Sequence, residues 1–337
     1  MTFEPQLKDC ETIDREAEFV QFYEQILEPF WQERTELGYF VNHQGLSIHY
    51  ATLLNPNAQS AIVISPGRIE GYLKYQELAY DVYRAGYSVF IIDHQGQGLS
   101  QRRLDDPHKG YVEDFQDYVR DFHLFIKQVI KPKFEGELHL LAHSMGCAIG
   151  LRYIQQHPHV FSKASFSSPM WGFRSGLVPE FIAKTLVAFG QWFHDTFKEK
   201  GAYFVGGQGY EDKPFLDNEL TNSEVRYRYF RDLYRRQPQL QLGGITFAWL
   251  NASITGLEMA YKELDKVRFP IQVFQAERDT VIDNQAQDEF CRRLAQFGQP
   301  CFGGRPEVIR DGKHELFMET DEKRQQVLTS LFAYLNS

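Results

Sequence analysis

Residues 138–157 read LHLLAHSMGCAIGLRYIQQH, and this stretch carries the strongest structural signal in the chain. The run Leu138–His143 is short and mostly apolar, which is typical of a buried strand. The run Met145–His157 has the length and apolar content of a helix packed on a sheet. Ser144 stands between them. The pattern therefore predicts a strand, a sharp turn and a helix, which is one unit of a parallel α/β sheet.

The same alternation of short apolar strands and helices continues on both sides of this stretch. A hairpin is expected first, around the Asn-His-Gln-Gly turn within Tyr39–Tyr50. Further strands are expected at 61–65, 87–93, 164–168, 271–275 and 307–310, and further helices at 75–85, 111–131, 285–296 and 322–335. Apolar strands that alternate with helices indicate a mostly parallel sheet flanked by helices, so the expected fold class is α/β.

The alternation is interrupted between residues 169 and 251. This segment is helical in tendency, and no strand stands out in it. We therefore expect residues 1–168 and 252–337 to form one α/β core, and residues 169–251 to form a helical cap inserted into it.

Composition excludes several classes of protein. The net charge of −9 argues against a nucleic-acid-binding groove, because phosphate backbones favour basic surfaces. No stretch approaches the roughly 18 apolar residues that a transmembrane helix needs, and the first residues are too acidic for a signal peptide. The cysteines show no metal-ligand spacing, so we expect free thiols and a cytoplasmic location. They are Cys10, Cys147, Cys291 and Cys301.

The turn around Ser144 resembles a nucleophile elbow. Ala142-His143-Ser144-Met145-Gly146 matches G-x-S-x-G, with Ala in place of the first Gly. Small residues are needed on both sides of the serine because the turn is tight. The alternative is an ordinary strand-to-helix turn that happens to contain serine. The strand before it and the helix after it favour Ser144 as the nucleophile.

A serine nucleophile needs a base and an orienting acid, which in this kind of sheet follow it along the chain. His314 is the one histidine after residue 194, and it follows the strand expected at 307–310. Asp279 comes a few residues after the strand expected at 271–275. Asp283 is its competitor and Glu277 a weaker one, but Asp283 is better placed to cap the next helix. We predict His314 as the base and Asp279 as the acid.

An oxyanion hole needs two backbone N–H groups. One is expected from Met145, which follows the serine. The other is expected from Arg68, in the loop Ser65-Pro66-Gly67-Arg68-Ile69-Glu70-Gly71 after the strand at 61–65. An ordinary strand-to-helix turn is again the alternative.

Several further stretches resemble a known family. The stretches are SPGRIEGYLKYQELA (65–79), IIDHQGQGLS (91–100), LDNELTNSEVRYRYFRDLYRRQPQLQLGG (216–244) and FGGRPEVIRDGKHELFMETDEKR (302–324). Together with AHSMG they are similar to the monoacylglycerol lipase and lysophospholipase branch of the α/β-hydrolases, and most of all to bacterial PldB-type lysophospholipases. Besides Ala142, the chain departs from the monoacylglycerol lipases at Pro66, where they have His, and at Arg68, where they have a small residue.

This resemblance implies an eight-stranded sheet with a helical cap over the site. It implies a serine hydrolase that cleaves the single acyl ester of lysophospholipids or monoacylglycerols through an acyl-enzyme, using Ser144, Asp279 and His314. We expect a small lipid as substrate, peripheral contact with the inner membrane, and no cofactor, metal or nucleic acid. His94 is interpreted as structural. The alternatives are a serine aminopeptidase, with Glu219 or Glu224 holding the substrate amine, a carboxylesterase for small esters, and a binding module that has no activity.

The expected cap is rich in aromatic residues and carries a basic cluster. Trp171, Trp192 and Trp249 are predicted to contact an acyl chain. The apolar run 181–193 is expected to form an acyl-chain tunnel or a membrane-facing lid, and cap core is the alternative for all of these residues. Arg226 is predicted to bind a phosphodiester head group, for which arginine is well suited. The alternative is a solvated helix face. The other members of the cluster are Arg228, Arg231, Arg235 and Arg236.

Overall fold

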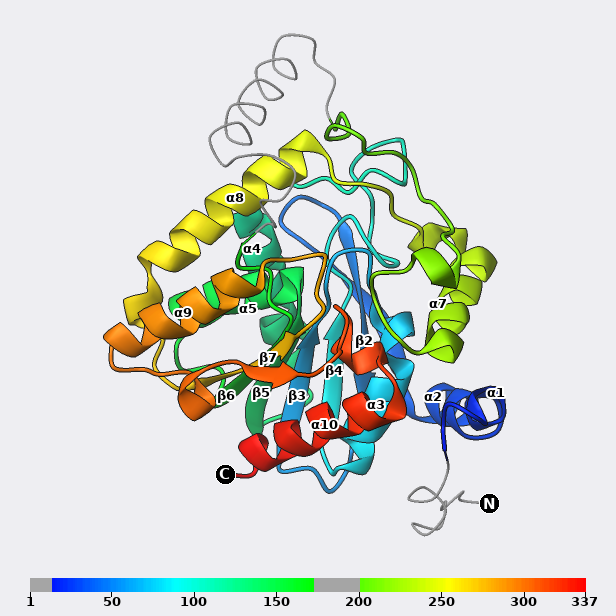
Figure 1. Cartoon of the computed structure of the whole chain (residues 1–337), viewed down its shortest axis with the longest axis horizontal. Coiled ribbons are helices and arrows are strands. Elements are labelled where there is room, and N and C mark those ends of the chain that lie inside the picture. The colour runs from blue at the N-terminus through cyan, green and yellow to red at the C-terminus, as the bar shows by residue number, and fades with distance from the viewer. Residues whose placement is uncertain (1–13, 173–200) are drawn as a thin grey trace.

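The computed structural model describes residues 14–172 and 201–337 (Figure 1). This part of the chain forms an eight-stranded sheet in the order β1-β2-β4-β3-β5-β6-β7-β8. β2 pairs antiparallel with β1 and β4, and every pairing from β4 to β8 is parallel. The strands are β1 (Glu36–Val41), β2 (Ser47–Leu53), β3 (Ser60–Ser65), β4 (Ser88–Ile92), β5 (Glu137–His143), β6 (Lys163–Ser167), β7 (Ile271–Ala276) and β8 (Glu307–Ile309).

Helices flank this sheet, so the predicted fold class is confirmed. The described α-helices are α1 (Phe19–Phe22), α2 (Glu28–Arg34), α3 (Gln76–Arg84), α4 (Phe115–Phe125), α5 (Met145–Gln156), α7 (Glu224–Arg236), α8 (Phe247–Lys262), α9 (Asn284–Gln296) and α10 (Asp321–Leu335). π-Helical turns occupy Tyr23–Leu27 and Ile126–Ile130. Short 3₁₀ turns lie at Tyr72–Tyr75, Phe215–Asp217, Pro238–Leu240, Leu264–Lys266, Phe302–Gly304 and Leu316–Met318.

Alternation along the central strands builds a core on each face of the sheet. On β3, Ala61 and Val63 pack with residues of α4, α5, α8 and α9. Ile62 and Ile64 point to the opposite face and pack with residues of α3 and α10. Successive side chains of a strand point to opposite faces, so a strand buried on both sides reads as a continuous apolar run. Figure 1 shows the two helical layers with the sheet between them.

The helix α7 belongs to neither layer and has a small core of its own (Figure 1). Its side chains Tyr227, Phe230 and Tyr234 are buried together with Leu240. This helix belongs to the segment expected to form a cap, and the division of the chain into core and cap stays a prediction. The boundary expected at residue 252 falls inside α8, which runs without a break from Phe247 to Lys262.

The expectation of free thiols is wrong for one pair of cysteines. Cys291 lies in α9 and Cys301 in the loop after it, and the two form a disulfide with their Cα atoms 5.4 Å apart. The turn after α9 brings Cys301 back against the helix. A separation of ten residues in the sequence does not by itself predict this pairing. Cys147 is a buried free thiol on α5, and Cys10 lies outside the described residues.

In the described part of the chain, the helices are all too short or too polar to span a bilayer.

A buried ion-pair network joins α7 to α3 and α10. Arg226 donates to both oxygens of Glu77, at 2.8 and 2.9 Å, and to Asp321 at 2.5 Å. Arg324 also pairs with Glu77. Burial alone would raise the pKa of Glu77, but the Arg324 and Arg226 charges lower it to about 2. The Glu77 carboxylate therefore stabilises the fold above its ordinary pKa of 4.5, and this contribution is lost as the pH falls from there towards 2.

We expect Arg226→Ala to lower the free energy of unfolding at neutral pH by about 3 kcal/mol, because it leaves Glu77 buried with fewer partners. Urea denaturation followed by circular dichroism measures the change. Arg228→Ala is the matched control, since Arg228 is exposed on the same helix and pairs only with Glu224 among the described residues. Surface pairs contribute at most about 1 kcal/mol. Equal losses for the two variants would contradict the structural role of Arg226.

Candidate active site

The elbow around Ser144 has the strained geometry that its sequence predicts. Ser144 lies between the end of β5 and the start of α5 with φ 49° and ψ −116°, a conformation that non-glycine residues rarely adopt. The N–H of Ser144 donates to the carbonyl of Ser167 at 3.0 Å. A Cβ on Gly146 would lie 2.0 Å from the carbonyl oxygen of Ser65, so only glycine fits there. Ala142 is buried between β3 and β6, where its methyl group is accommodated.

The structure brings the predicted nucleophile, base and acid together. His314 Nε2 lies 3.0 Å from Ser144 Oγ, and His314 Nδ1 lies 2.7 Å from Asp279 Oδ2. The other carboxylate oxygen of Asp279 accepts the N–H groups of Val281 and Ile282 at 2.9 and 3.1 Å. The carboxylate is therefore held in place and aimed at the imidazole. All three side chains are buried.

The competing acids have other partners. Asp283 is the N-cap of α9 and accepts the N–H of Gln285 at 2.9 Å. Glu277 accepts the N–H of Asp311 at 2.8 Å, in an exposed position. These contacts favour Asp279 as the acid, and the catalytic roles of all three residues stay a prediction.

The loop after β3 lies against the nucleophile. A Cβ on Gly67 would lie 3.1 Å from Ser144 Cβ, so the glycine permits this close approach. The N–H groups of Arg68 and Met145 donate to no acceptor in residues 14–172 and 201–337. Buried N–H groups ordinarily have hydrogen-bond partners, so two that have none among these residues stand out. Both are available for the oxyanion role predicted for them.

A buried charged cluster ties this loop to the elbow and to the loop of His314. Glu70 Oε2 accepts the N–H of Gly67 at 2.6 Å and contacts His143 Nδ1 at 2.9 Å. Lys74 Nζ joins Glu70 to Glu315, at 3.0 and 2.5 Å. The other ring nitrogen of His143 lies 3.2 Å from the carbonyl oxygen of His314. One network thus fixes the three loops that carry the reacting groups.

The charges of this cluster stabilise one another. Burial alone would raise the pKa of Glu70, but the charges of His143 and Lys74 and the hydrogen bonds from His143 and Tyr75 lower it well below its usual range. Burial alone would lower the pKa of His143, but Glu70 raises it. None of these residues was predicted from the sequence to have a role. The spacing of Glu70 and Lys74, one helical turn apart, was the one signal available.

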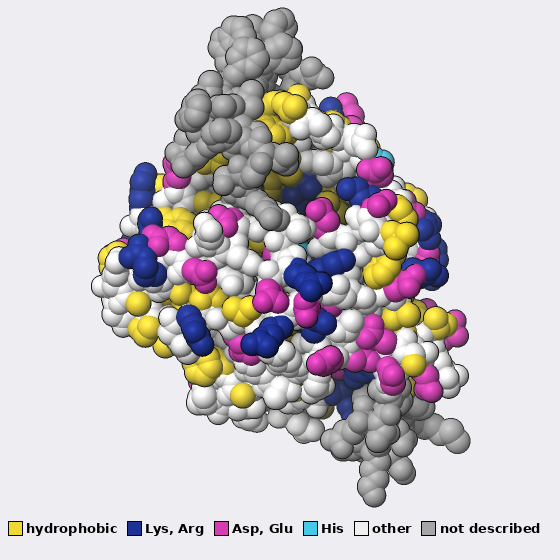
Figure 2. Space-filling model, viewed as in Figure 1, with side chains coloured by type: hydrophobic (Ala, Val, Ile, Leu, Met, Phe, Trp, Pro, Cys, Tyr) yellow, Lys and Arg dark blue, Asp and Glu magenta, His cyan; other side chains and the backbone are white. Residues whose placement is uncertain are grey.

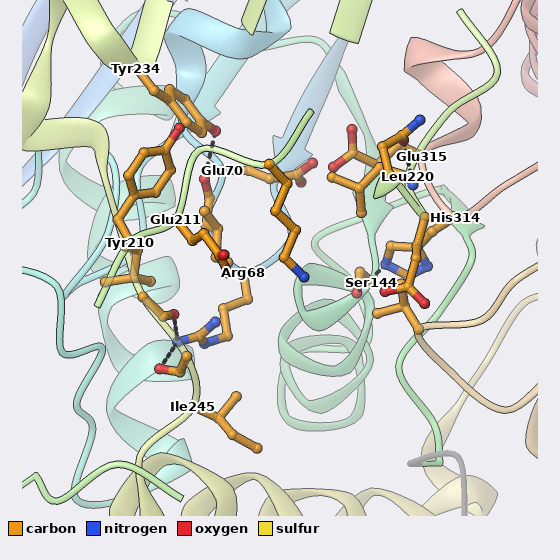
Figure 3. Close-up of a pocket in the computed structure, with 18 of the residues that line it drawn as sticks. Arg68, Glu70, Ser144, Tyr210, Glu211, Leu220, Tyr234, Ile245, His314 and Glu315 are labelled. Atoms are coloured by element: carbon orange, nitrogen blue, oxygen red, sulfur yellow. Dashed lines mark hydrogen bonds between the residues drawn. The ribbon is translucent and has the colours of Figure 1, made fainter. Parts of the chain in front are cut away.

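A cavity of about 540 Å³ opens above Ser144 and His314. Figure 3 shows Arg68, Tyr210 and Tyr234 on one side of it, and Ser144 and His314 on the other. Its apolar wall includes Ile69, Met170, Leu220, Tyr227, Phe230, Leu242, Ile245, Trp249 and Ile282. In the space-filling view, hydrophobic and basic side chains meet in a hollow in the upper half of the molecule (Figure 2).

The residues predicted to bind substrate differ in where the structure places them. Trp249 lines the cavity. Trp171 does not line it, because its ring is buried in the core, stacked on Phe290 with centroids 3.5 Å apart. Trp192 and the run 181–193 lie outside the described residues.

The basic cluster also needs correction. Arg226 is occupied by Glu77 and Asp321 and lies outside the cavity wall, so it does not present its guanidinium to a ligand. Its position on a helix did not reveal that this face packs against α3 and α10. Arg228 and Arg235 are exposed and paired with carboxylates. Of the predicted cluster, Arg231 lines the cavity.

His94 is wholly buried beneath the site. Its Nε2 lies 2.9 Å from Ser65 Oγ, and burial lowers the pKa of His94 to about 3. The neutral ring contacts the end of β3, which agrees with the structural role predicted for His94.

Comparison with known proteins gives a family match and similar sequences. A family model described as serine aminopeptidase, S33, matches residues 56–321. The chain is 36% identical over 331 residues to lysophospholipase L2 of Escherichia coli strain K12, which covers 98% of this chain and 95% of that protein. It is 33% identical over 327 residues to the probable lysophospholipase L2 of Haemophilus influenzae, which covers 96% and 98%.

A solved structure of monoglyceride lipase from Saccharomyces cerevisiae, in complex with a substrate analog, is also similar. It matches with a TM-score of 0.66 over 90% of this chain and 96% of that chain, at 18% identity. At this identity the likeness concerns the fold alone.

Proposed function

The chain belongs to the serine aminopeptidase S33 family of α/β-hydrolases, and from this premise we propose that it is a serine hydrolase of lipid acyl esters. It is a carboxylic ester hydrolase whose substrates are lysophospholipids or monoacylglycerols. The observation that carries the proposal is the continuous contact from Asp279 through His314 to Ser144, which opens onto the cavity.

The proposed reaction follows from this contact. Ser144 Oγ attacks the acyl carbonyl while His314 Nε2 accepts its proton, and Asp279 stabilises the imidazolium that forms. The N–H groups of Arg68 and Met145 stabilise the negative oxygen of the tetrahedral intermediate. His314 then protonates the leaving glycerol oxygen. A water molecule, deprotonated by the same histidine, releases the fatty acid from Ser144.

The cavity wall supports a lipid substrate over a peptide. Its apolar residues suit one acyl chain, because burying methylene groups is favourable. An aminopeptidase would need a carboxylate to hold the substrate amine. Glu224 is paired with Arg228 and lies outside the cavity wall. Glu219 lines the cavity and accepts a hydrogen bond from Thr280, so it is the carboxylate on which that alternative depends.

A side-by-side hydrolysis assay tests the proposal. Its substrates are lysophosphatidylcholine, lysophosphatidylethanolamine, monoacylglycerol, a short-chain ester and an aminoacyl amide. We expect the long-chain esters to be hydrolysed with the highest kcat/KM. Preference for the aminoacyl amide would establish the aminopeptidase, and preference for the short ester would establish a small-ester carboxylesterase.

We also propose that the protein takes its substrate from the membrane surface by peripheral contact. Two apolar side chains at the cavity rim support this. Leu216 is 94% exposed and Val205 71% exposed, and each is next in sequence to a residue that lines the cavity. Exposed apolar side chains beside a lipid site suit insertion among lipid head groups. The cytoplasmic location at the inner membrane stays a prediction. One of its premises, that all four cysteines are free thiols, does not hold, because Cys291 and Cys301 form a disulfide.

We expect Leu216→Glu to weaken binding to phosphatidylethanolamine–phosphatidylglycerol vesicles by about tenfold, because it replaces the proposed apolar contact with lipid by a charge. Vesicle sedimentation measures the bound fraction. Val20→Glu is the matched control, since Val20 is 68% exposed but lies on α1, away from the cavity wall. A similar loss of vesicle binding for both variants would mean that repulsion of the added charge, and not the loss of the Leu216 side chain, weakens binding.

A further inference from the structure

Arg68 places a guanidinium in the wall of the cavity, directly beside the oxyanion loop. Its Nη2 donates to the carbonyl oxygens of Gly243 and Gly244, each at 2.7 Å (Figure 3). Its guanidinium carbon lies 5.2 Å from the centre of the Trp249 ring. These contacts fix the orientation of the side chain, and none of them supplies a negative charge.

The charge of Arg68 has no carboxylate partner in the part of the chain that the structure describes. Its Nε is buried and makes no hydrogen bond within those residues. Burial lowers the pKa of Arg68 to about 10, still high enough to keep the group protonated at neutral pH. Other buried cations nearby are paired: Lys74 with Glu70 and Glu315, and Arg226 with Glu77 and Asp321.

A partly buried cation without a counter-ion is costly unless a ligand supplies the anion. The position of Arg68 indicates where that anion belongs on the substrate. The backbone N–H of this residue is proposed to face the acyl carbonyl oxygen, so the guanidinium lies within one side-chain length of the reacting ester. In a lysophospholipid, the phosphate is separated from the acyl ester by one glycerol unit.

We propose that Arg68 binds the phosphate of a lysophospholipid and thereby makes the enzyme prefer lysophospholipids to monoacylglycerols with the same acyl chain. This inference rests on the proposed function and names the substrate class within it. Arginine suits the task because its fork of N–H donors matches phosphate oxygens. Arg231 is the competing residue in the wall. It is held by the hydroxyl of Tyr210 at 3.2 Å and the carbonyl of Glu211 at 3.3 Å.

The test is the ratio of kcat/KM for lysophosphatidylethanolamine to kcat/KM for the monoacylglycerol of the same chain, measured in the same mixed micelles. Both esters use the same oxyanion hole, so any effect of a substitution on that hole cancels in the ratio. We expect Arg68→Gln to lower the ratio about ten- to hundredfold, the range for a hydrogen bond to a charged group. Arg68→Lys keeps the charge but loses the fork of N–H donors, so its ratio should lie between those of Arg68→Gln and the wild type.

Two further variants and a folding check complete the experiment. Arg228→Gln is the control, because Arg228 is exposed and paired with Glu224, and its ratio should equal that of the wild type. Labelling of Ser144 by a fluorophosphonate reports that each variant is folded. An unchanged ratio in Arg68→Gln, or a loss confined to Arg231→Gln, overturns the inference while the lipid esterase stands. Wild-type protein that hydrolyses neither lipid overturns the proposed function itself.

Discussion

Ser144→Ala should abolish lipid ester hydrolysis, with a fall in kcat of up to about a millionfold. The structure gives the physical reason: Ser144 Oγ is the atom that His314 Nε2 contacts at 3.0 Å, and alanine leaves the base nothing to activate. Triad residues act as one unit, so loss of the nucleophile removes the contribution of the other two as well. Initial rates on lysophosphatidylethanolamine, at saturating substrate, measure the effect.

The matched control for this prediction is Ser162→Ala. Ser162 is an exposed serine outside the cavity wall, and its replacement should leave kcat unchanged. A fluorophosphonate should label the wild type and Ser162→Ala but not Ser144→Ala. A rate of hydrolysis in Ser144→Ala close to that of the wild type would remove Ser144 from the mechanism, since the oxyanion hole and substrate binding alone leave only a small residual rate.

Asp279→Asn should lower kcat by about 10⁴-fold, the scale seen when the triad acid of a serine protease is replaced by its amide. The Asp279 carboxylate accepts a hydrogen bond from His314 Nδ1 at 2.7 Å and holds the ring with Nε2 towards Ser144. An amide in its place favours the wrong tautomer and offers no charge to stabilise the imidazolium. The kcat of the purified variant, compared with wild type on the same lipid, measures this loss.

Asp283→Asn is the matched control for the acid. Asp283 caps α9 through the N–H of Gln285, and asparagine is an equally good cap, so both activity and stability should change little. A large loss in Asp283→Asn together with a small one in Asp279→Asn would make Asp283 the acid.

The site could be located from sequence because parallel strands bring their carboxyl ends to one edge. Ser144 follows β5, Asp279 follows β7 and His314 follows β8, so residues far apart in the chain were expected to meet. The strand pattern was strong there, because strands buried on both faces are continuously apolar. Gly146 and Gly67 could be interpreted in the same way, since each allows a close approach of backbone.

Other features depend on packing that no local pattern contains. Arg226 resembles its exposed neighbours in sequence, yet it lies against α3 and α10 and pairs with Glu77. Trp171 follows the end of β6 and turns into the core against Phe290. In both cases the partner is contributed by a distant segment. The role of a charged or aromatic side chain in this region is therefore set by which elements pack against it.

The cluster of Glu70, Lys74, His143 and Glu315 beside the site also could not be predicted from the sequence. Each residue is an ordinary polar residue in the sequence, and only the fold brings the four together behind the reacting groups. A buried charge is tolerated because its neighbours are charged and hydrogen-bonded. Arg68 differs from them in having no such neighbour among the described residues, and this contrast appears only in three dimensions.

Mass spectrometry of the acid-quenched enzyme tests whether Ser144 carries the acyl group during turnover. The enzyme is mixed with excess lysophosphatidylethanolamine, quenched within the first turnovers and digested. We expect a peptide carrying one acyl group on Ser144, with no such adduct in Ser144→Ala. An acyl group on a different residue, with Ser144 unmodified, would contradict the proposed mechanism.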